Sequence, residues 1–237
     1  MTPFPPEPLE PIHDERLFRQ LRFLVEIDRL KGVLRRTYLV GAERLENSAE
    51  HSWHLAVACM VLAEHADEPV DILRALKMVL VHDLVEIDAG DTYAYDPAAH
   101  VDKAEREQRA AERIFGLLPE EQAQEFHALW REFEARKTPE ARFANALDRL
   151  IPLLHSIHTG GRSWRQGQVV RSQVARRLAP IREVSTALGE AAEALLRWAV
   201  DQGLLPDDTA QGPTHPCPDE GPHPSMAAPP KPTPPSG

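Results

Sequence analysis

The chain has 237 residues, long enough for one sizeable core or two small ones, and with 42% hydrophobic and 27% charged residues its composition is typical of a soluble globular protein. Its formal net charge of −10 argues against a protein that binds bulk nucleic acid, which would carry a basic excess. The sequence indicates neither a membrane span, which needs about 18 continuous apolar residues, nor a secretory signal. Cys59 lies in an apolar run and Cys217 in a Pro-rich one. We therefore expect no disulfide and a reducing, cytoplasmic location.

Proline marks the expected boundaries of the chain. Of the 22 prolines, five fall in residues 1–11 and eleven in residues 206–237. We predict a Pro-rich N-terminal segment over 1–11, one helical domain over 12–204 and a disordered Pro-rich tail over 205–237. The tail could recruit a partner that reads extended proline segments, but its generic composition favours a solubilising role.

The body between these segments reads as helices with short breaks and shows no alternating strand pattern, which predicts an all-α fold. Apolar residues recur at helical spacing over 14–33. Asn47, followed three positions later by Glu50, resembles a capping box at the start of the second helix. Asp71 is the expected N-cap of a third helix, which the periodicity extends over 72–87.

The second half of the body continues the helical pattern. Residues 101–117 predict a strongly charged helix with a solvated face. Thr138-Pro139 begins another helix, and the run Thr159–Gly161 ends it. Helical periodicity resumes over 167–202, with Pro180 as a kink or a break.

Three of these helices carry imidazole or carboxylate groups where an aliphatic residue is expected. His51 shares a stripe with apolar residues, His82 and Asp83 continue apolar stripes, and Asp148 does the same further along. A lone histidine on such a face is more often a hydrogen-bonded core residue than a ligand. An adjacent His-Asp pair instead points to a group at the helix seam, and a divalent cation would neutralise the buried carboxylates. The mixed nitrogen and oxygen set suits Mn, Co, Fe, Ni or Zn better than Ca.

The motifs around these residues carry a family resemblance. "AEHSWHLA", "LVHDLVEIDAGDT" and "ALDRL" resemble the HD-domain metal-dependent phosphohydrolases, whose ligands follow the order H…HD…D. Within that family, the EHS run and the E and G-D that follow the HD pair are similar to the YfbR-like 5′-deoxynucleotidases and their eukaryotic relatives. The resemblance covers residues 15–160 and implies hydrolysis of (deoxy)nucleoside 5′-monophosphates to nucleoside and phosphate, by an enzyme that is commonly a dimer.

The resemblance also implies a role for each matching position. The quartet His51, His82, Asp83 and Asp148 corresponds to the metal ligands of the family. Glu86 matches the catalytic acid that acts on the attacking water. Asp91 matches a residue near the sugar and the reaction centre, and Arg35 or Arg36 corresponds to the phosphate clamp.

One departure from the family pattern leaves two points open. The bacterial enzymes carry an arginine followed by a tryptophan, and the tryptophan helps to exclude a ribose 2′-OH. Here Arg35 and Arg36 are followed by "TYLV", so that Tyr38 is the only aromatic residue at hand. Which arginine binds phosphate, and whether selectivity for deoxynucleotides is kept, both stay open.

Two alternatives to a nucleoside monophosphatase remain. One is an HD phosphohydrolase that acts on another nucleotide, a dNTP or an alarmone. A triphosphate would need more positive charge than the sequence offers, because only the arginines of "LRR" lie near the motifs. The other is a non-catalytic module that senses a nucleotide, which the complete set of ligands and acids opposes. His155 and His158 share the face of Asp148, where they either support the site or pack, and "LLHSIHTGGRSW" has no assigned function.

Overall fold

The computed structural model describes Leu9 and residues 12–209. The predictions for the segment 1–11, Leu9 apart, and for the tail beyond residue 209 lie outside the described residues. The residues directly after 204, which were predicted to belong to the tail, still pack against the domain. Leu205 is buried, and the Pro206 carbonyl accepts a hydrogen bond of 2.9 Å from the backbone N–H of Arg171. The packed domain therefore extends past the predicted boundary at 204, because the apolar Leu205 still reaches the core.

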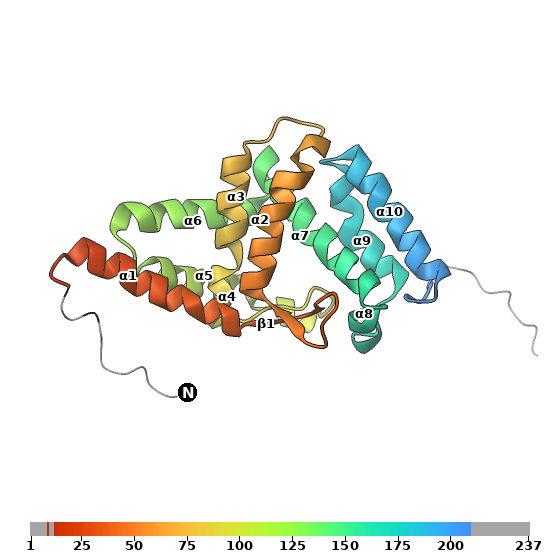
Figure 1. Ribbon diagram of the computed structural model, residues 1–237, viewed down its shortest axis with the longest axis horizontal. Coiled ribbons are helices and arrows are strands. Elements are labelled where there is room, and N and C mark those ends of the chain that lie inside the picture. The colour runs from red at the N-terminus through yellow and green to blue at the C-terminus, as the bar shows by residue number, and fades with distance from the viewer. Residues whose placement is uncertain (1–8, 10–11, 210–237) are drawn as a thin grey trace, which may run out of the picture.

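The described residues confirm the all-α prediction, since helices make up nearly all the regular structure. Figure 1 shows α2, α3 and α7 at the centre, α1, α5 and α6 at one end, and α8, α9 and α10 at the other. None of the described helices has the length and apolarity required to cross a membrane. The bounds are α1 Glu15–Ile27, α2 Ser48–Leu62, α3 Ile72–Val81, α4 Glu86–Ala89, α5 Lys103–Phe115, α6 Glu120–Ala135, α7 Pro139–His158, α8 Arg162–Gln166, α9 Arg171–Arg182 and α10 Thr186–Asp201.

The predicted capping residues begin the helices that carry the site. Asn47 and Glu50 form the expected capping box at the start of α2. The Asp71 side chain accepts from the third residue of α3, and the Thr138 side chain accepts from the third residue of α7. Pro180 lies inside α9, and the break that it was expected to cause falls three residues later, before α10.

A short hairpin precedes α2 that the sequence did not predict. β1 (Leu34–Tyr38) pairs antiparallel with β2 (Leu45–Asn47), with Tyr38 opposite Leu45. β1 contains two adjacent arginines, and β2 has only three residues, so neither shows apolar alternation over a useful length. The hairpin sends the chain from β2 directly into the N-terminus of α2.

The third predicted helix also ends earlier than expected. α3 stops at Val81, and the chain tightens into a 3₁₀ helix over His82–Val85 before α4 begins at Glu86. A tighter turn rotates side chains relative to an α-helix, and such segments inside helices often mark functional positions. His82 and Glu86 nevertheless remain buried, as the helical stripes predicted.

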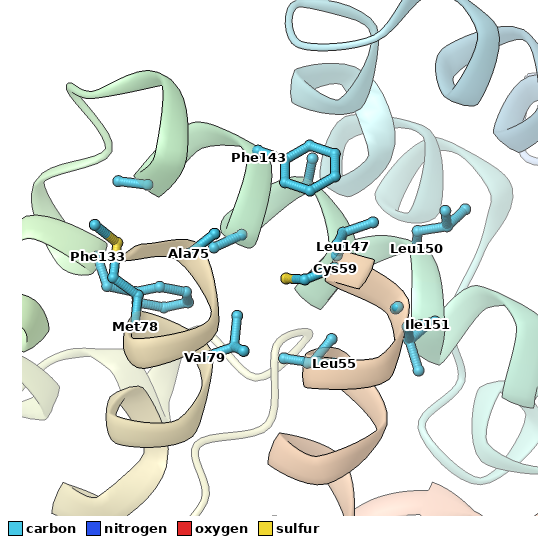
Figure 2. Packing of buried hydrophobic residues seen from close by; sticks show 14 of the residues in the cluster. Leu55, Cys59, Ala75, Met78, Val79, Phe133, Phe143, Leu147, Leu150 and Ile151 are labelled. Carbon is cyan, nitrogen blue, oxygen red and sulfur yellow. The ribbon is translucent and has the colours of Figure 1, made fainter. Parts of the chain in front are cut away.

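The core that holds the site lies between α2, α3 and α7. Its apolar side chains also reach α6, whose Phe133 carbonyl accepts a hydrogen bond of 2.8 Å from the buried amide of Asn145. Burying such a cluster supplies the main driving force for folding, at roughly 25 cal/mol per Å² of apolar surface. Figure 2 labels ten of these residues: Leu55, Cys59, Ala75, Met78, Val79, Phe133, Phe143, Leu147, Leu150 and Ile151.

Candidate active site

The four predicted metal ligands meet in space. His51 comes from the first turn of α2, His82 and Asp83 from the 3₁₀ helix, and Asp148 from the middle of α7. His51 Nε2 lies 3.0 Å from Asp148 Oδ1, and the rings of His51 and His82 have centroids 5.8 Å apart. Potential ligand atoms of His51, His82 and Asp83 all lie within 4.8 Å of one another. We call these four residues the quartet.

The chemistry of the quartet fits a divalent cation. His82 Nδ1 lies 2.8 Å from the Val79 carbonyl, so Nδ1 carries the proton and Nε2 presents a lone pair. That lone pair faces Asp83 Oδ1 at 2.9 Å and receives no hydrogen bond. Two acceptors at this distance repel unless a proton or a metal lies between them. Without metal, burial opposes the charged imidazole, but Asp83 and Asp148 raise the pKa of His82 to about 9.

Glu86, at the start of α4, is the buried carboxylate beside the quartet. Its Oε2 accepts a hydrogen bond of 2.6 Å from the hydroxyl of Ser48, which is itself fully buried. Burial and the charge of Asp83 raise the pKa of Glu86 well above its ordinary value, while Arg35 acts in the opposite direction. Glu86 can therefore exchange a proton at a higher pH than an exposed glutamate. Sequence reasoning did not identify Ser48, although it directly follows the cap Asn47.

The two candidate arginines occupy different environments. Arg35 Nη1 lies 2.9 Å from Asp83 Oδ2 and 3.5 Å from Asp91 Oδ1. Burial disfavours its charge, but these carboxylates raise the pKa of Arg35 overall. Arg36 is exposed, with its guanidinium 5.2 Å from the centroid of the Tyr93 ring. Arg35 thus lies at the quartet, and Arg36 lies at the rim of the cleft.

Asp91 completes the acidic side of the site. Burial raises its pKa, and the nearby Arg35 acts against this rise. Asp88, three positions before Asp91, is exposed and pairs with Arg113 of α5. The two acids of this stretch therefore separate into one that faces the site and one that joins α4 to α5.

Behind the quartet lies Glu46 of β2, a residue that sequence reasoning missed. Its side chain is fully buried, and Oε2 lies 3.6 Å from both His51 Nδ1 and Arg35 Nε. Oε1 lies 3.7 Å from Nδ1 of His155. A carboxylate behind a ligating histidine fixes the orientation of the ring. The unpredicted β2 delivers this group, so no helical pattern could have revealed it.

The downstream histidines divide between the interior and the surface. His155 is buried beside Glu46, and its ring centroid lies 5.2 Å from that of His54. His158 is exposed at the end of α7 and contacts neither the quartet nor Glu46. Of the two histidines that shared the face of Asp148 in the sequence, only His155 therefore lies near the site.

The quartet opens into a cleft that residues of β1, α5, α7, α8 and α9 line. One wall is aromatic and contains Tyr93, Tyr95 and Trp164. Trp164 belongs to α8, which begins after Gly161 at φ +72. The run "TGGRSW" thus turns the chain so that α8 can line the cleft. Tyr38 does not line the cleft. Its hydroxyl instead donates a hydrogen bond of 3.1 Å to the side-chain oxygen of Gln166 in α8.

The cleft also contains more positive charge than the sequence indicated. Beyond Arg35 and Arg36, its lining includes Lys103, Arg136, Arg149 and Arg177. Burial and the neighbouring Arg136 and Arg177 lower the pKa of Arg149 to about 10. The expectation that only the "LRR" arginines serve the pocket was therefore wrong, because α5, α7, α9 and the residue after α6 contribute cations that are remote in sequence.

Comparisons with known proteins agree with this geometry. The HD domain family model matches residues 27–188. Mouse 5′-deoxynucleotidase HDDC2 is 33% identical over 137 residues, which cover 57% of this chain and 67% of that protein. Fission yeast 5′-deoxynucleotidase hdd1 is 30% identical over 132 residues, covering 54% and 65% of the two chains.

A solved structure supports the same assignment. The predicted metal-dependent phosphohydrolase from Magnetospirillum magnetotacticum is 51% identical, with a TM-score of 0.78 over 87% of this chain and 100% of that one. These matches confirm the resemblance that the motifs carried. Because the family model spans more than half of its length, the chain belongs to the HD-domain family.

Proposed function

We propose that the protein is a metal-dependent phosphomonoesterase that converts (deoxy)nucleoside 5′-monophosphates into nucleoside and inorganic phosphate. One observation carries the proposal: the quartet, Glu86 and Arg35 converge in a single cleft with an aromatic wall. Relatives that are 30 to 33% identical and named 5′-deoxynucleotidases support this substrate class.

The quartet would hold the metal through two imidazoles and two carboxylates. This donor set favours Mn, Co, Fe, Ni or Zn over Ca. A divalent cation bound there would polarise the phosphoryl group and lower the pKa of water toward about 7. Glu46 would keep the His51 ring oriented from behind.

The remaining residues would handle protons and charge. Glu86, with its raised pKa, would accept a proton from the attacking water. Arg35 would bind the phosphoryl oxygens, because it lies at the quartet rather than at the rim. As the bond from phosphorus to the 5′ oxygen breaks, Asp91 would give a proton to the leaving oxygen, a role that suits its raised pKa. The base would lie against Tyr93 and Trp164.

The proposal also covers the location, the oligomeric state and the domain organisation of the protein. A reducing cytoplasm suits Cys59, which is buried and free. A homodimer, which the family resemblance implies, would have an apolar face available on α2, where Trp53 and Met60 are 65% and 57% exposed. The predicted organisation, one helical domain between two Pro-rich segments, stays part of the same proposal.

A phosphate-release assay tests the function. Deoxynucleoside and ribonucleoside 5′-monophosphates would be supplied with Mn²⁺, Co²⁺ or EDTA, and release should require metal. Glu86→Gln should keep its metal and lose at least 100-fold in kcat, while the exposed Glu64→Gln serves as the matched control. No release from any monophosphate by metal-loaded protein would overturn the proposed function.

A substrate with a second phosphate is the one alternative that an observation favours, namely the additional arginines of the cleft. A purely sensory module gains no such support, since the buried Glu86 and Asp91 beside the quartet would have no task in it.

A further inference from the structure

The cleft continues at its mouth into a second, shallower recess. The two share Tyr95, His100, Arg149 and Arg177 in their linings, so that they form one continuous depression. We call the second part the outer recess and define it by Tyr95, His100, Arg149, Gln173, Arg176 and Arg177. Gln173, Arg176 and Arg177 follow one another at i, i+3 and i+4 and so share a face of α9.

The charge of the outer recess is one-sided. Three arginines line it, and among the described residues no carboxylate does. The chain as a whole carries a net charge of −10, so this grouping does not reflect a general basic excess. The inner cleft differs, because there Arg35 is surrounded by Asp83, Asp91 and Glu46.

Two of the three arginines of the outer recess lack ion-pair partners among the described residues. Within the described part of the chain, neither Arg149 nor Arg176 has a carboxylate oxygen within 4.0 Å, and the Nε of Arg149 is buried without a hydrogen bond. Buried donors and grouped like charges are costly unless an anion satisfies them. Guanidinium groups match the geometry of phosphate.

We propose that the outer recess is a second anion-binding subsite that takes a phosphate group. Arg177 connects it to the quartet, because its Nη2 lies 3.5 Å from Asp148 Oδ2 while the residue lines both recesses. A nucleotide that carries two phosphates would present one at the quartet and the other to Arg149 and Arg176. Free phosphate or pyrophosphate would satisfy the same groups. The nucleotide source rests on the proposed function, whereas the free anion does not.

Two measurements on the full-length, metal-loaded protein test the subsite. The first compares kcat/KM for a deoxynucleoside 5′-monophosphate with kcat/KM for the matching 3′,5′-bisphosphate and 5′-triphosphate. The second is calorimetric titration with inorganic pyrophosphate. Both use wild type, Arg176→Gln and Arg131→Gln, since Arg176 and Arg131 are both exposed but Arg131 lines neither recess.

If a second phosphate of the substrate occupies the recess, Arg176→Gln lowers the ratio of kcat/KM for the bisphosphate or the triphosphate to kcat/KM for the monophosphate at least fivefold, and Arg131→Gln leaves it unchanged. If a free anion occupies it, the ratio stays constant and Arg176→Gln weakens pyrophosphate binding at least fivefold. An unchanged ratio together with unchanged pyrophosphate affinity overturns the proposal. If wild type hydrolyses no nucleotide, the proposed function fails, and the titration still tests the subsite.

Discussion

His51 and Asp148 are 97 positions apart in the chain, yet His51 Nε2 lies 3.0 Å from Asp148 Oδ1. The contact depends on the packing of α2 against α7 through the apolar core that Figure 2 shows. Burial opposes the charge of Asp148, but the hydrogen bond from His51 and the charge of Arg177 hold its pKa well below the usual range. The core thus brings together two groups that prefer to share a cation.

Replacing Asp148 tests whether this pair holds metal. Asp148→Asn keeps the shape of the side chain but removes its charge, and we expect metal content below 0.2 equivalents and a loss of at least 100-fold in phosphate release, since losing a charged ligand is costly. Metal analysis of the purified protein checks the first value. Asp201→Asn, an exposed aspartate outside the cleft, is the control. Full metal occupancy in Asp148→Asn would remove Asp148 from the ligand set.

Removing the metal should make stability depend on pH in a defined direction. In the metal-free protein, His82 has a pKa of about 9, raised from 6.5, so the folded state holds this proton more tightly. The resulting stability is fully present below pH 6.5 and is lost as pH rises through 9. Asp83 and Asp148 have lowered pKa values, so their contribution is present above the unfolded pKa of 3.8 and is lost as pH falls.

Between pH 6.5 and 9 we expect the free energy of unfolding of the metal-free protein to fall by about 1–3 kcal/mol. A bound cation takes the place of the proton, so the metal-loaded protein should lack this loss. Urea unfolding at both pH values, with Mn²⁺ or with EDTA, measures the increment that metal adds to the free energy of unfolding. The increment should be larger at pH 9, and an equal increment at both pH values would contradict the assignment of His82 to the quartet.

Local patterns predicted the helices, and the quartet followed from inward-facing stripes together with the motif order of the family that the sequence resembles. Caps such as Asn47 and Asp71 act within one turn, and the apolar stripes identified His82 as inward-facing even though the helix tightens there. Glu46 escaped prediction because β2 has only three residues, and its burial depends on a pairing with β1 that no period reveals.

The outer recess escaped prediction for a different reason. Arg149 and Arg177 lie 28 positions apart, on α7 and α9, and only the packing of these helices brings them to one surface. In the sequence each arginine reads as part of a solvated helix face. Long-range placement of like charges has no local signature, so neither the outer recess nor the additional cations of the cleft could be read from the residues.

Glu46→Gln tests the carboxylate behind His51. The substitution keeps size and burial but weakens the interaction with His51 Nδ1 and Arg35 Nε, which both lie 3.6 Å from Oε2. We expect metal affinity to fall about 10- to 100-fold, as is usual for groups that support a ligand. Competition with a fluorescent chelator measures the affinity, with Glu64→Gln as the exposed control. If Glu46→Gln binds metal as wild type does, Glu46 does not position the ligand.

The turn at Gly161 should be intolerant of a side chain. Gly161 has φ +72, a conformation that L residues rarely adopt, and an added Cβ would lie 2.5 Å from the carbonyl oxygen of Leu204. We expect Gly161→Ala to destabilise the protein by about 1–3 kcal/mol and to displace α8. In a background in which Trp53, Trp130 and Trp198 are replaced by Phe, quenching of Trp164 fluorescence by acrylamide should then increase. Gly32→Ala is the matched control, because a Cβ there meets no atom within 4 Å. If both variants unfold at the same urea concentration and Trp164 stays protected, the turn does not hold α8 against the cleft.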